Sequence, residues 1–325
     1  MSTTTQQKPL KVKAVPVSLD ATHPPSPHNI LPAHEFTMGL IAPKGSGKTT
    51  LLINLLTYYR KYFHAIYIFS PTVKNDEKWD WVKQQDLVLE NKPLKRWYKE
   101  LKAKRGDNPV VDEPAGGDSA EAADAMDRNI SGGKSSGPGE RFDGRIPESN
   151  FMYEYDEGTL GAIMDDQQAV IDFLHEHGVT KHLGNRVLII FDDLVGSALF
   201  SNARNNRFKR LNTNHRHGSF SIMMVSQAYK EIPKTIRSNF SCLIIFEIFS
   251  DAEIQAIHDE YPMGLRKEQW EQVYAYAVAG DHSFMFYNMQ KPRTQRIMRN
   301  FDQVLFFRDE PGAKAEPKKR GKLGV

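Results

Sequence analysis

The sequence predicts an α/β domain with a mostly parallel β-sheet and helices on both faces. Short β-branched and aromatic runs alternate with segments that carry leucines at helical spacing, and one run, Val187 to Phe191, is apolar throughout. A fully apolar strand is typical of a parallel sheet that is covered on both faces. The apolar content, 40% of 325 residues, is enough to bury a core.

The expected elements alternate between strand and helix along most of the chain. Strands are expected at residues 36–41, 65–69, 187–191, 220–226, 242–248 and 282–289. Helices are expected at residues 48–63, 160–177, 198–214, 252–261 and 267–279. This alternation favours parallel strands joined by helical crossovers.

Three stretches are expected to differ from the folded domain, which we place at residues 31–310. Residues 1–30 are rich in Thr, Pro and Lys without periodicity, which predicts a disordered arm. Residues 103–150 are rich in Gly, Ser, Asp, Glu and Pro, which predicts a disordered acidic insert within the domain. Residues 311–325 are expected to form a basic flexible tail, whose KKRGK run is also compatible with a nuclear signal or a nonspecific DNA contact.

Composition excludes several classes of protein. No run approaches the roughly 20 apolar residues of a membrane span, and the N-terminal sequence lacks the apolar stretch of a signal peptide, so we expect a soluble intracellular protein. The single cysteine, Cys242, lies in an apolar run and cannot form an intrachain disulfide. The net charge is only +3, so any nucleic-acid surface must come from local clusters of basic residues.

A glycine-rich segment, APKGSGKTT, stands between the first expected strand and the first expected helix, which is the context of a phosphate-binding loop. The residues expected to surround the ATP phosphates are Ala42, Pro43, Lys44, Gly45, Ser46, Gly47, Lys48, Thr49 and Thr50. Lys48 is expected to reach the β and γ phosphates and Thr49 to ligate Mg²⁺. Ala42 replaces the first glycine of the pattern, and the complete GSGKTT argues against a chance glycine turn. The sequence therefore predicts a P-loop NTPase, with a RecA-like sheet and ATP and Mg²⁺ as ligands.

Two acidic residues follow the apolar strand at 187–191. Asp192 emerges at the carboxyl edge of the sheet, where open parallel sheets bind ligands, and is expected to hold Mg²⁺ together with Thr49. Asp193 is expected to orient the attacking water or accept its proton. A role in capping the next turn is the alternative for Asp193.

Three further polar residues are candidates for the catalytic site. Gln227 ends the strand SIMMVSQ and could contact the γ-phosphate or water, although a solvated residue at a strand end is nearly as good an interpretation. Arg216 and Arg237 lie in polar loops and could reach the γ-phosphate of a neighbouring subunit, with Arg216 preferred. For either arginine the alternative is an ordinary solvated charge.

Aromatic and basic residues interleave between residues 78 and 99. Trp79, Trp81, Trp97 and Tyr98 stand among lysines and arginines, a mixture that could stack on bases and hold phosphates. An amphipathic helix that packs its tryptophans on the core explains the pattern equally well.

Taken together, five segments resemble the genome-packaging ATPases of large DNA viruses. They are APKGSGKTT, YIFSPT, LIIFDDL, NTNHRHGSFSIMMVSQ and IPKTIRSNFSCLIIF. Those enzymes belong to the FtsK-HerA superfamily, with relatives in virophages and Maverick-like self-synthesising transposons. The resemblance covers residues 36–249 apart from the acidic insert. It implies that Lys48 and Thr49 are the Walker A lysine and threonine, Asp192 and Asp193 the Walker B acids, and Gln227 the sensor glutamine.

The same resemblance implies a homo-oligomeric ring that moves double-stranded DNA into a preformed capsid, with ATP bound between subunits and a capsid or portal protein as a candidate partner. It places the protein in the host cytoplasm or nucleus, or with the virion. Lys209, Arg210 and Arg216 are candidates for loops that grip DNA phosphates. A P-loop kinase or a nucleotide-dependent switch is the alternative. The second acid, Asp193, argues against a kinase, and the lack of an NKxD sequence argues against GTP.

Overall fold

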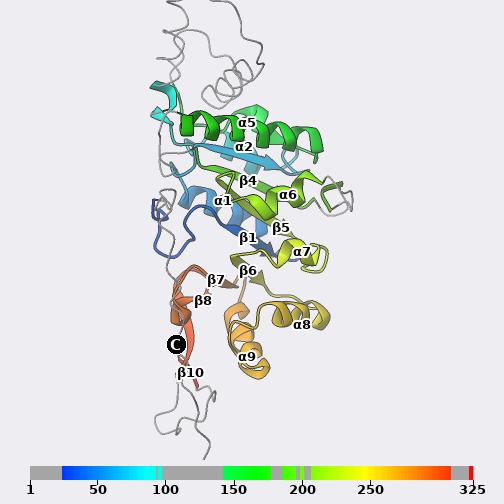
Figure 1. Cartoon of the computed structure of the whole chain (residues 1–325). Helices are drawn as coiled ribbons and strands as arrows, with labels where there is room; N and C mark the ends of the chain where they lie inside the picture. The colour runs from blue at the N-terminus through cyan, green and yellow to red at the C-terminus, as the bar shows by residue number, and fades with distance from the viewer. Residues whose placement is uncertain are drawn as a thin grey trace, which may run out of the picture.

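The centre of the structure is a set of parallel strands, as the sequence predicts. The computed structural model describes residues 24–92, 94–96, 142–176, 185–194, 198–200, 206–308 and 322–324. Its strands join one ten-stranded sheet in the order β10-β9-β8-β7-β6-β1-β5-β4-β2-β3 (Figure 1). The parallel strands are β1 (Thr37–Ile41), β2 (Ala65–Phe69), β3 (Phe151–Met152), β4 (Val187–Asp192), β5 (Phe220–Ser226) and β6 (Cys242–Phe246).

The parallel pairing brings the carboxyl ends of three strands together. β1 lies between β5 and β6, so that Leu40 faces Val225 on one side and Ile244 on the other. β4 lies between β5 and β2, and its last residue, Asp192, also pairs with Val225. The loops that follow β1, β4 and β5 therefore meet at one edge of the sheet, where open α/β sheets bind ligands.

Beyond β6 the sheet continues with antiparallel strands. They are β7 (Phe284–Asn288), β8 (Ile297–Arg299), β9 (Gln303–Arg308) and β10 (Lys322–Gly324). β7 pairs with β6, and Phe284 at its start faces Phe246 at the end of β6. The turn before β7 consequently lies at the same edge of the sheet as the loop that follows β1.

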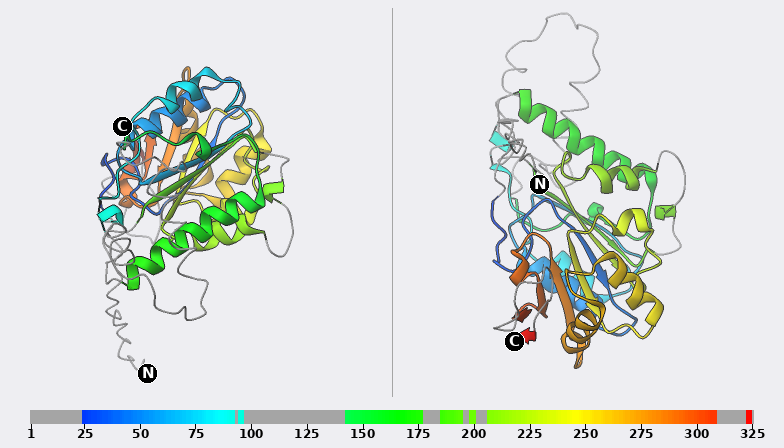
Figure 2. Two further views of the ribbon diagram at one scale, coloured as in Figure 1. Left: turned by 90° about the horizontal axis from the view of Figure 1, so that it is seen from above. Right: turned by 60° about the horizontal axis from the view of Figure 1, so that its bottom comes forward.

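Helices cover both faces of the sheet, which confirms the predicted fold class. One face carries α1 (Lys48–Tyr58) and α2 (Glu77–Lys83). The other face carries α5 (Glu157–Glu176), α6 (Arg207–Asn214), α7 (Lys234–Arg237), α8 (Asp251–Glu260) and α9 (Lys267–Val278). The left view of Figure 2 shows α5 in green on one side of the sheet and the blue and cyan helices on the other. The remaining helical elements are the 3₁₀ turns η1 (Glu148–Asn150), η3 (Ala198–Phe200) and η4 (Arg293–Gln295).

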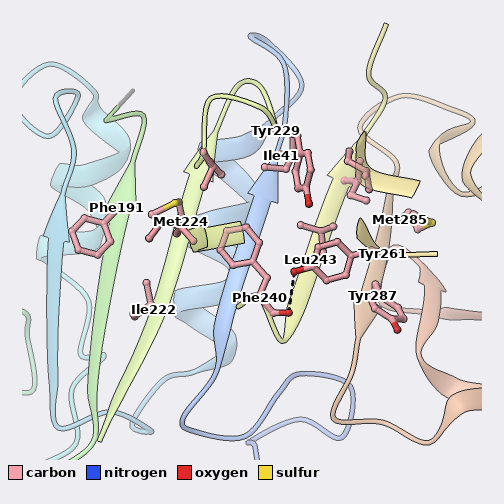
Figure 3. Close-up of a cluster of buried hydrophobic side chains, with 14 of the residues drawn as sticks. Ile41, Phe191, Ile222, Met224, Tyr229, Phe240, Leu243, Tyr261, Met285 and Tyr287 are labelled. Carbon is pink, nitrogen blue, oxygen red and sulfur yellow. Dashed lines mark hydrogen bonds between the residues drawn. The ribbon is translucent and has the colours of Figure 1, made fainter. Parts of the chain in front are cut away.

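Alternate residues of the central strands belong to two separate hydrophobic clusters. In β4, Leu188 and Ile190 pack with α1 and α2, whereas Ile189 and Phe191 pack with the helices of the opposite face. Figure 3 shows part of this second cluster, where Phe191 lies on the same face of the sheet as Phe240. All six residues of β4 are buried, as expected for a strand that is covered on both sides.

Several boundaries differ from the expected ones. The helix expected at 48–63 ends at Tyr58, after which the chain forms tight turns, with the Tyr62 N–H donating to the Tyr59 carbonyl at 3.0 Å. The strand expected at 242–248 ends at Phe246. The helix expected at 198–214 is replaced by η3 and α6. Helix α6 begins after Asn206, whose side chain accepts a hydrogen bond from the Lys209 N–H at 2.8 Å.

The expected arm, insert and tail fall largely outside the described residues. Residues 1–23, 101–141 and 309–321 belong to this part of the chain. The last residues of the expected insert are part of the fold, because Ile146 is buried and the Asn150 side chain donates to the Ile66 carbonyl at 3.1 Å. In the expected tail, Lys322–Gly324 pair with β9 as strand β10.

Candidate nucleotide site

The glycine-rich loop leaves the carboxyl end of β1 and leads directly into α1. Gly45 and Gly47 have φ angles of 84° and 95°, in the left-handed region that favours glycine, and Gly47 is the N-cap of α1. The Ser46 hydroxyl donates to the Pro43 carbonyl at 2.7 Å. Ala42 is buried, and its N–H donates to the Ser226 carbonyl at 3.0 Å. Ala42 does not have a positive φ, so the backbone at this position does not require the glycine of the pattern.

Three of the predicted residues meet above this loop, each from a different element. Lys48 begins α1, and its Nζ lies 3.1 Å from Oδ2 of Asp193, which follows β4. Gln227 follows β5, and its amide Nε2 donates to Asp193 at 2.8 Å from Oδ2 and 3.0 Å from Oδ1. Asp193 has a φ of 54°, in the left-handed region that is uncommon for a residue with a Cβ and that aspartate adopts more readily than most. Its carboxylate therefore faces both the first helix and the end of the neighbouring strand.

Asp192 has a different environment from the adjacent Asp193. Its carboxyl group is almost completely buried and accepts a hydrogen bond at Oδ2 from the Ser70 hydroxyl at 2.8 Å. Burial raises the pKa of Asp192, while the Ser70 hydrogen bond and the positive charge of Lys48 act in the opposite direction. The other oxygen, Oδ1, is buried and has no hydrogen-bond partner among the described residues.

A buried carboxylate oxygen without a donor is suited to a cation. Thr49, in the first turn of α1, offers a hydroxyl oxygen as the second ligand that the sequence predicts. Among the described residues no group of three or more His, Cys, Asp or Glu side chains could hold a metal ion by itself. One carboxylate, from Asp192, and one hydroxyl, from Thr49, would suit Mg²⁺, which in nucleotide sites takes one or two protein ligands and completes its shell with phosphate oxygens and water.

Ser70 is a site residue that the sequence interpretation missed, although it stands in the quoted segment YIFSPT. Its hydroxyl contacts Asp192 and lies 2.9 Å from the Thr72 hydroxyl, which in turn accepts a hydrogen bond from Trp79 Nε1 at 3.0 Å. The signal was available, because Ser70 is the first polar residue after an apolar strand. What the sequence lacks is the pairing of β2 with β4, which brings Ser70 to Asp192.

Arg237 is engaged inside its own chain. Its Nε and Nη2 contact the two carboxylate oxygens of Glu260 at 2.8 and 2.7 Å, and its Nη1 donates to the Ile232 carbonyl at 2.8 Å. The guanidinium also lies 4.7 Å from the ring centre of Tyr229, and Arg237 is only 9% exposed. The structure thus gives Arg237 a role in holding α7 against α8 and lends no support to its prediction as an arginine finger.

Arg216 is exposed and lies far from Asp193 of the same chain. It stands in the turn before β5, whereas Gln227 follows the other end of that strand. The seven residues of β5 extend about 23 Å at about 3.3 Å per residue. A role for Arg216 at a γ-phosphate therefore requires a second subunit.

The mixed aromatic and basic stretch divides between core and surface. Trp79 in α2 is completely buried, which supports the core interpretation for this residue, whereas Trp81 is 46% exposed. Trp97 and Tyr98 lie outside the described residues. Of the predicted DNA-gripping residues on α6, Lys209 is partly buried and Arg210 is exposed.

A family model described as Poxvirus A32 protein matches residues 27–99 and 155–276, which is more than half of the chain. The chain belongs to this family. The matched Poxvirus A32 segments contain the phosphate-binding loop, Ser70, both acids and Gln227, and membership confirms the resemblance to viral packaging P-loop ATPases. Residues 100–154, between the two matched segments, overlap the expected acidic insert.

Several solved structures are similar to this Poxvirus A32 family member at low identity. The genome packaging NTPase B204 from Sulfolobus turreted icosahedral virus 2, in complex with AMP, is 12% identical with a TM-score of 0.43, over 81% of this chain and 96% of that chain. The DNA-packaging ATPase B204 from Sulfolobus turreted icosahedral virus is 11% identical with a TM-score of 0.44, over the same shares. EssC (ATPases 2 and 3) from Geobacillus thermodenitrificans is 10% identical with a TM-score of 0.35, over 83% of this chain and 38% of that chain.

Two further findings are negative. No curated protein matches the sequence. In the part of the chain that the structure describes, no helix combines the length and the apolar character needed to cross a membrane.

Proposed function

We propose that this chain is an ATP-driven double-stranded DNA translocase that packages a viral genome into a capsid. The observation that carries the proposal is the cluster of Lys48, Asp193 and Gln227 at the carboxyl edge of the sheet, above the glycine-rich loop. The family supports a packaging ATPase. Coupling of hydrolysis to DNA movement is the further step that we propose.

Each residue has a distinct task in ATP hydrolysis. The glycine-rich loop and Lys48 bind the β and γ phosphates, so Lys48 must exchange its contact with Asp193 for phosphate oxygens. Thr49 and Asp192 would hold Mg²⁺, which when bound neutralises charge on the phosphate oxygens. Asp193 accepts a hydrogen bond from the attacking water and orients it in line with the γ-phosphate. Gln227 fixes the Asp193 carboxylate through its amide and can sense whether the γ-phosphate is present.

The partners follow from the proposed work on DNA. Subunits form a homo-oligomeric ring in which Arg216 of one subunit reaches the ATP of the next, because Arg216 is exposed and lies at the opposite end of β5 from Gln227. Lys209 and Arg210 lie in the same stretch of chain and would contact DNA phosphates, and Arg216 is a candidate for that contact instead of the ATP site. A capsid or portal protein would anchor the ring, in the host cytoplasm or nucleus or at the virion.

ATP hydrolysis by the purified protein, with and without linear double-stranded DNA, tests this proposal. We expect DNA to stimulate the rate and Lys48→Ala to abolish it, because the lysine bridges phosphate oxygens. Because the electrostatic contacts to DNA release counterions, the stimulation should weaken as salt rises. A rate that does not respond to DNA contradicts the translocase and favours the kinase or the switch.

A further inference from the structure

The turn between α9 and β7 lies against the glycine-rich loop, although the two are far apart in sequence. His282 Nδ1 is 3.0 Å from the carbonyl oxygen of Ser46. A Cβ placed on Gly47 would lie 3.2 Å from the same nitrogen, so the imidazole packs directly against the loop. A carbonyl oxygen can only accept a hydrogen bond, so Nδ1 carries the proton and donates it.

Hydrogen bonds at both ends of the turn hold the segment that carries His282. Arg299 donates to the Ala279 carbonyl at the start of the turn. Asn300 exchanges two hydrogen bonds with Phe284 at its end, of 2.9 and 3.2 Å. His282 itself has a φ of 58°, in the left-handed region that side chains with a Cβ rarely adopt. Such a conformation persists only where the surrounding structure enforces it, and it is often found where the side chain has a function.

The contact fixes the orientation of one peptide unit in the loop. In a planar trans peptide the carbonyl and the N–H point in opposite directions. When the Ser46 carbonyl is held toward His282, the N–H of Gly47 must point away from the turn. Gly47 is the N-cap of α1, so its N–H lies at the helix N-terminus, where backbone donors without an intrahelical partner bind phosphate.

The loop is therefore held from two sides. On the β5 side the Ala42 N–H donates to the Ser226 carbonyl at 3.0 Å. On the side of β6 and β7, His282 holds Ser46. The catalytic cluster of Asp193 and Gln227 lies on the β5 side, so the His282 contact is separate from it.

We propose that His282 is a positioning residue, which orients the Ser46–Gly47 peptide so that the glycine-rich loop is preformed for the phosphates of ATP. The inference rests on ATP binding by this loop and is independent of DNA movement. His282 does not touch the reacting atoms and acts through the loop.

Three variants of the full chain test this role. His282→Ala removes the donor. His282→Asn places an amide N–H near the position of Nδ1, and His217→Ala is the control, since His217 is also exposed but lies in the turn before β5 at the other edge of the sheet. The measurements are the dissociation constant for a fluorescent ATP analogue, and KM and kcat for ATP hydrolysis.

We expect His282→Ala to weaken ATP binding and raise KM about three- to tenfold with little change in kcat, which is the range for one lost neutral hydrogen bond. His282→Asn should recover most of the affinity, and His217→Ala should match the wild type. The inference is overturned if His282→Ala binds ATP as tightly as the wild type, or if His282→Asn is as weak as His282→Ala. Lack of stimulation by DNA in the wild type would contradict only the translocase and would leave these ratios unchanged.

Discussion

Ser70→Ala tests whether the hydrogen bond from Ser70 helps the buried Asp192 carboxylate to bind a cation. The substitution removes the hydroxyl that donates to Asp192 Oδ2 at 2.8 Å and leaves a small apolar side chain in a fully buried position. Since Oδ1 already lacks a hydrogen-bond partner among the described residues, the carboxylate would also lose the Ser70 hydroxyl, the donor to its other oxygen. Alanine occupies almost the same volume, so the packing is kept, and the other change is the loss of the contacts that the Ser70 hydroxyl makes with Thr72.

The expected size of the effect follows from the charge of the acceptor. A hydrogen bond to a charged group contributes about 1.5–3 kcal/mol, and about 1.4 kcal/mol corresponds to a factor of ten. Partners that orient a metal-binding carboxylate typically change metal affinity about 10- to 100-fold, which agrees with that range. We therefore expect the Mg²⁺ concentration for half-maximal ATP hydrolysis to rise at least about tenfold.

The pH dependence of ATP hydrolysis should also change, and Ser70→Ala should need a higher pH than the wild type for full activity. Burial raises the pKa of Asp192 and the Ser70 hydrogen bond opposes this rise, so the pKa of Asp192 in the variant lies higher than in the wild type. Only the ionised carboxylate binds Mg²⁺, so the loss of activity on acidification begins at a higher pH in Ser70→Ala.

Titrations of Mg²⁺ at several pH values, with ATP at saturation, measure both effects. Ser70→Thr, which keeps the hydroxyl, is the matched control and should stay close to the wild type. An unchanged Mg²⁺ requirement together with an unchanged acid limb in Ser70→Ala would refute the reasoning. It would mean that Asp192 does not depend on Ser70 or does not bind the ion.

Three further predictions concern charged residues. Asp193→Asn should lower kcat about 100-fold or more, because the attacking water loses its hydrogen-bond acceptor. ATP binding should persist, because Lys48 is released from its ion pair with Asp193. An equal loss of ATP binding and turnover would count against this assignment. Arg237→Ala should lower the free energy of unfolding in urea by about 3 kcal/mol, because Glu260 keeps a largely buried charge without its arginine partner. A variant that is as stable as the wild type but does not hydrolyse ATP would instead restore Arg237 as an arginine finger. Arg216→Ala should keep the unfolding midpoint and ATP binding but lower hydrolysis by the assembled protein about 1,000-fold, and full hydrolysis would remove Arg216 from the site.

The parts of the site that could be predicted are those that a short sequence motif identifies. The glycine-rich loop, Lys48 and the two acids are recognisable because each stands at a fixed place relative to a strand or helix. Asp192 and Asp193 are adjacent in sequence, yet one is buried beside Ser70 and the other turns to Lys48 through a positive φ. The sequence predicts a separate task for each acid from their order after the strand, but the backbone turn that gives them separate environments is not visible in the sequence.

What the sequence did not predict depends on contacts between distant segments, including the Glu260 partner of the candidate Arg237 and the role of His282. Arg237 meets Glu260 across 23 positions, and His282 meets Ser46 across 236. No local pattern of charge or hydropathy marks either pair. The strands β8 and β9 were also missed. β8 has three residues and is too short to show the alternation that identifies a strand, and the six residues of β9, QVLFFR, do not alternate between apolar and polar.

The pairing of β6 with β7 limits how far the chain can be shortened from its C-terminal side. The family match ends at residue 276, before β7 begins at Phe284. A fragment cut at that point would turn β6 into an edge strand, with a row of unpaired backbone donors and acceptors beside an apolar surface, which invites aggregation. It would also lose the turn that contacts Ser46. The smallest fragment that keeps the glycine-rich loop intact must therefore extend past the family match and include at least β7, β8 and Asn300, since Arg299 and Asn300 anchor the turn before β7.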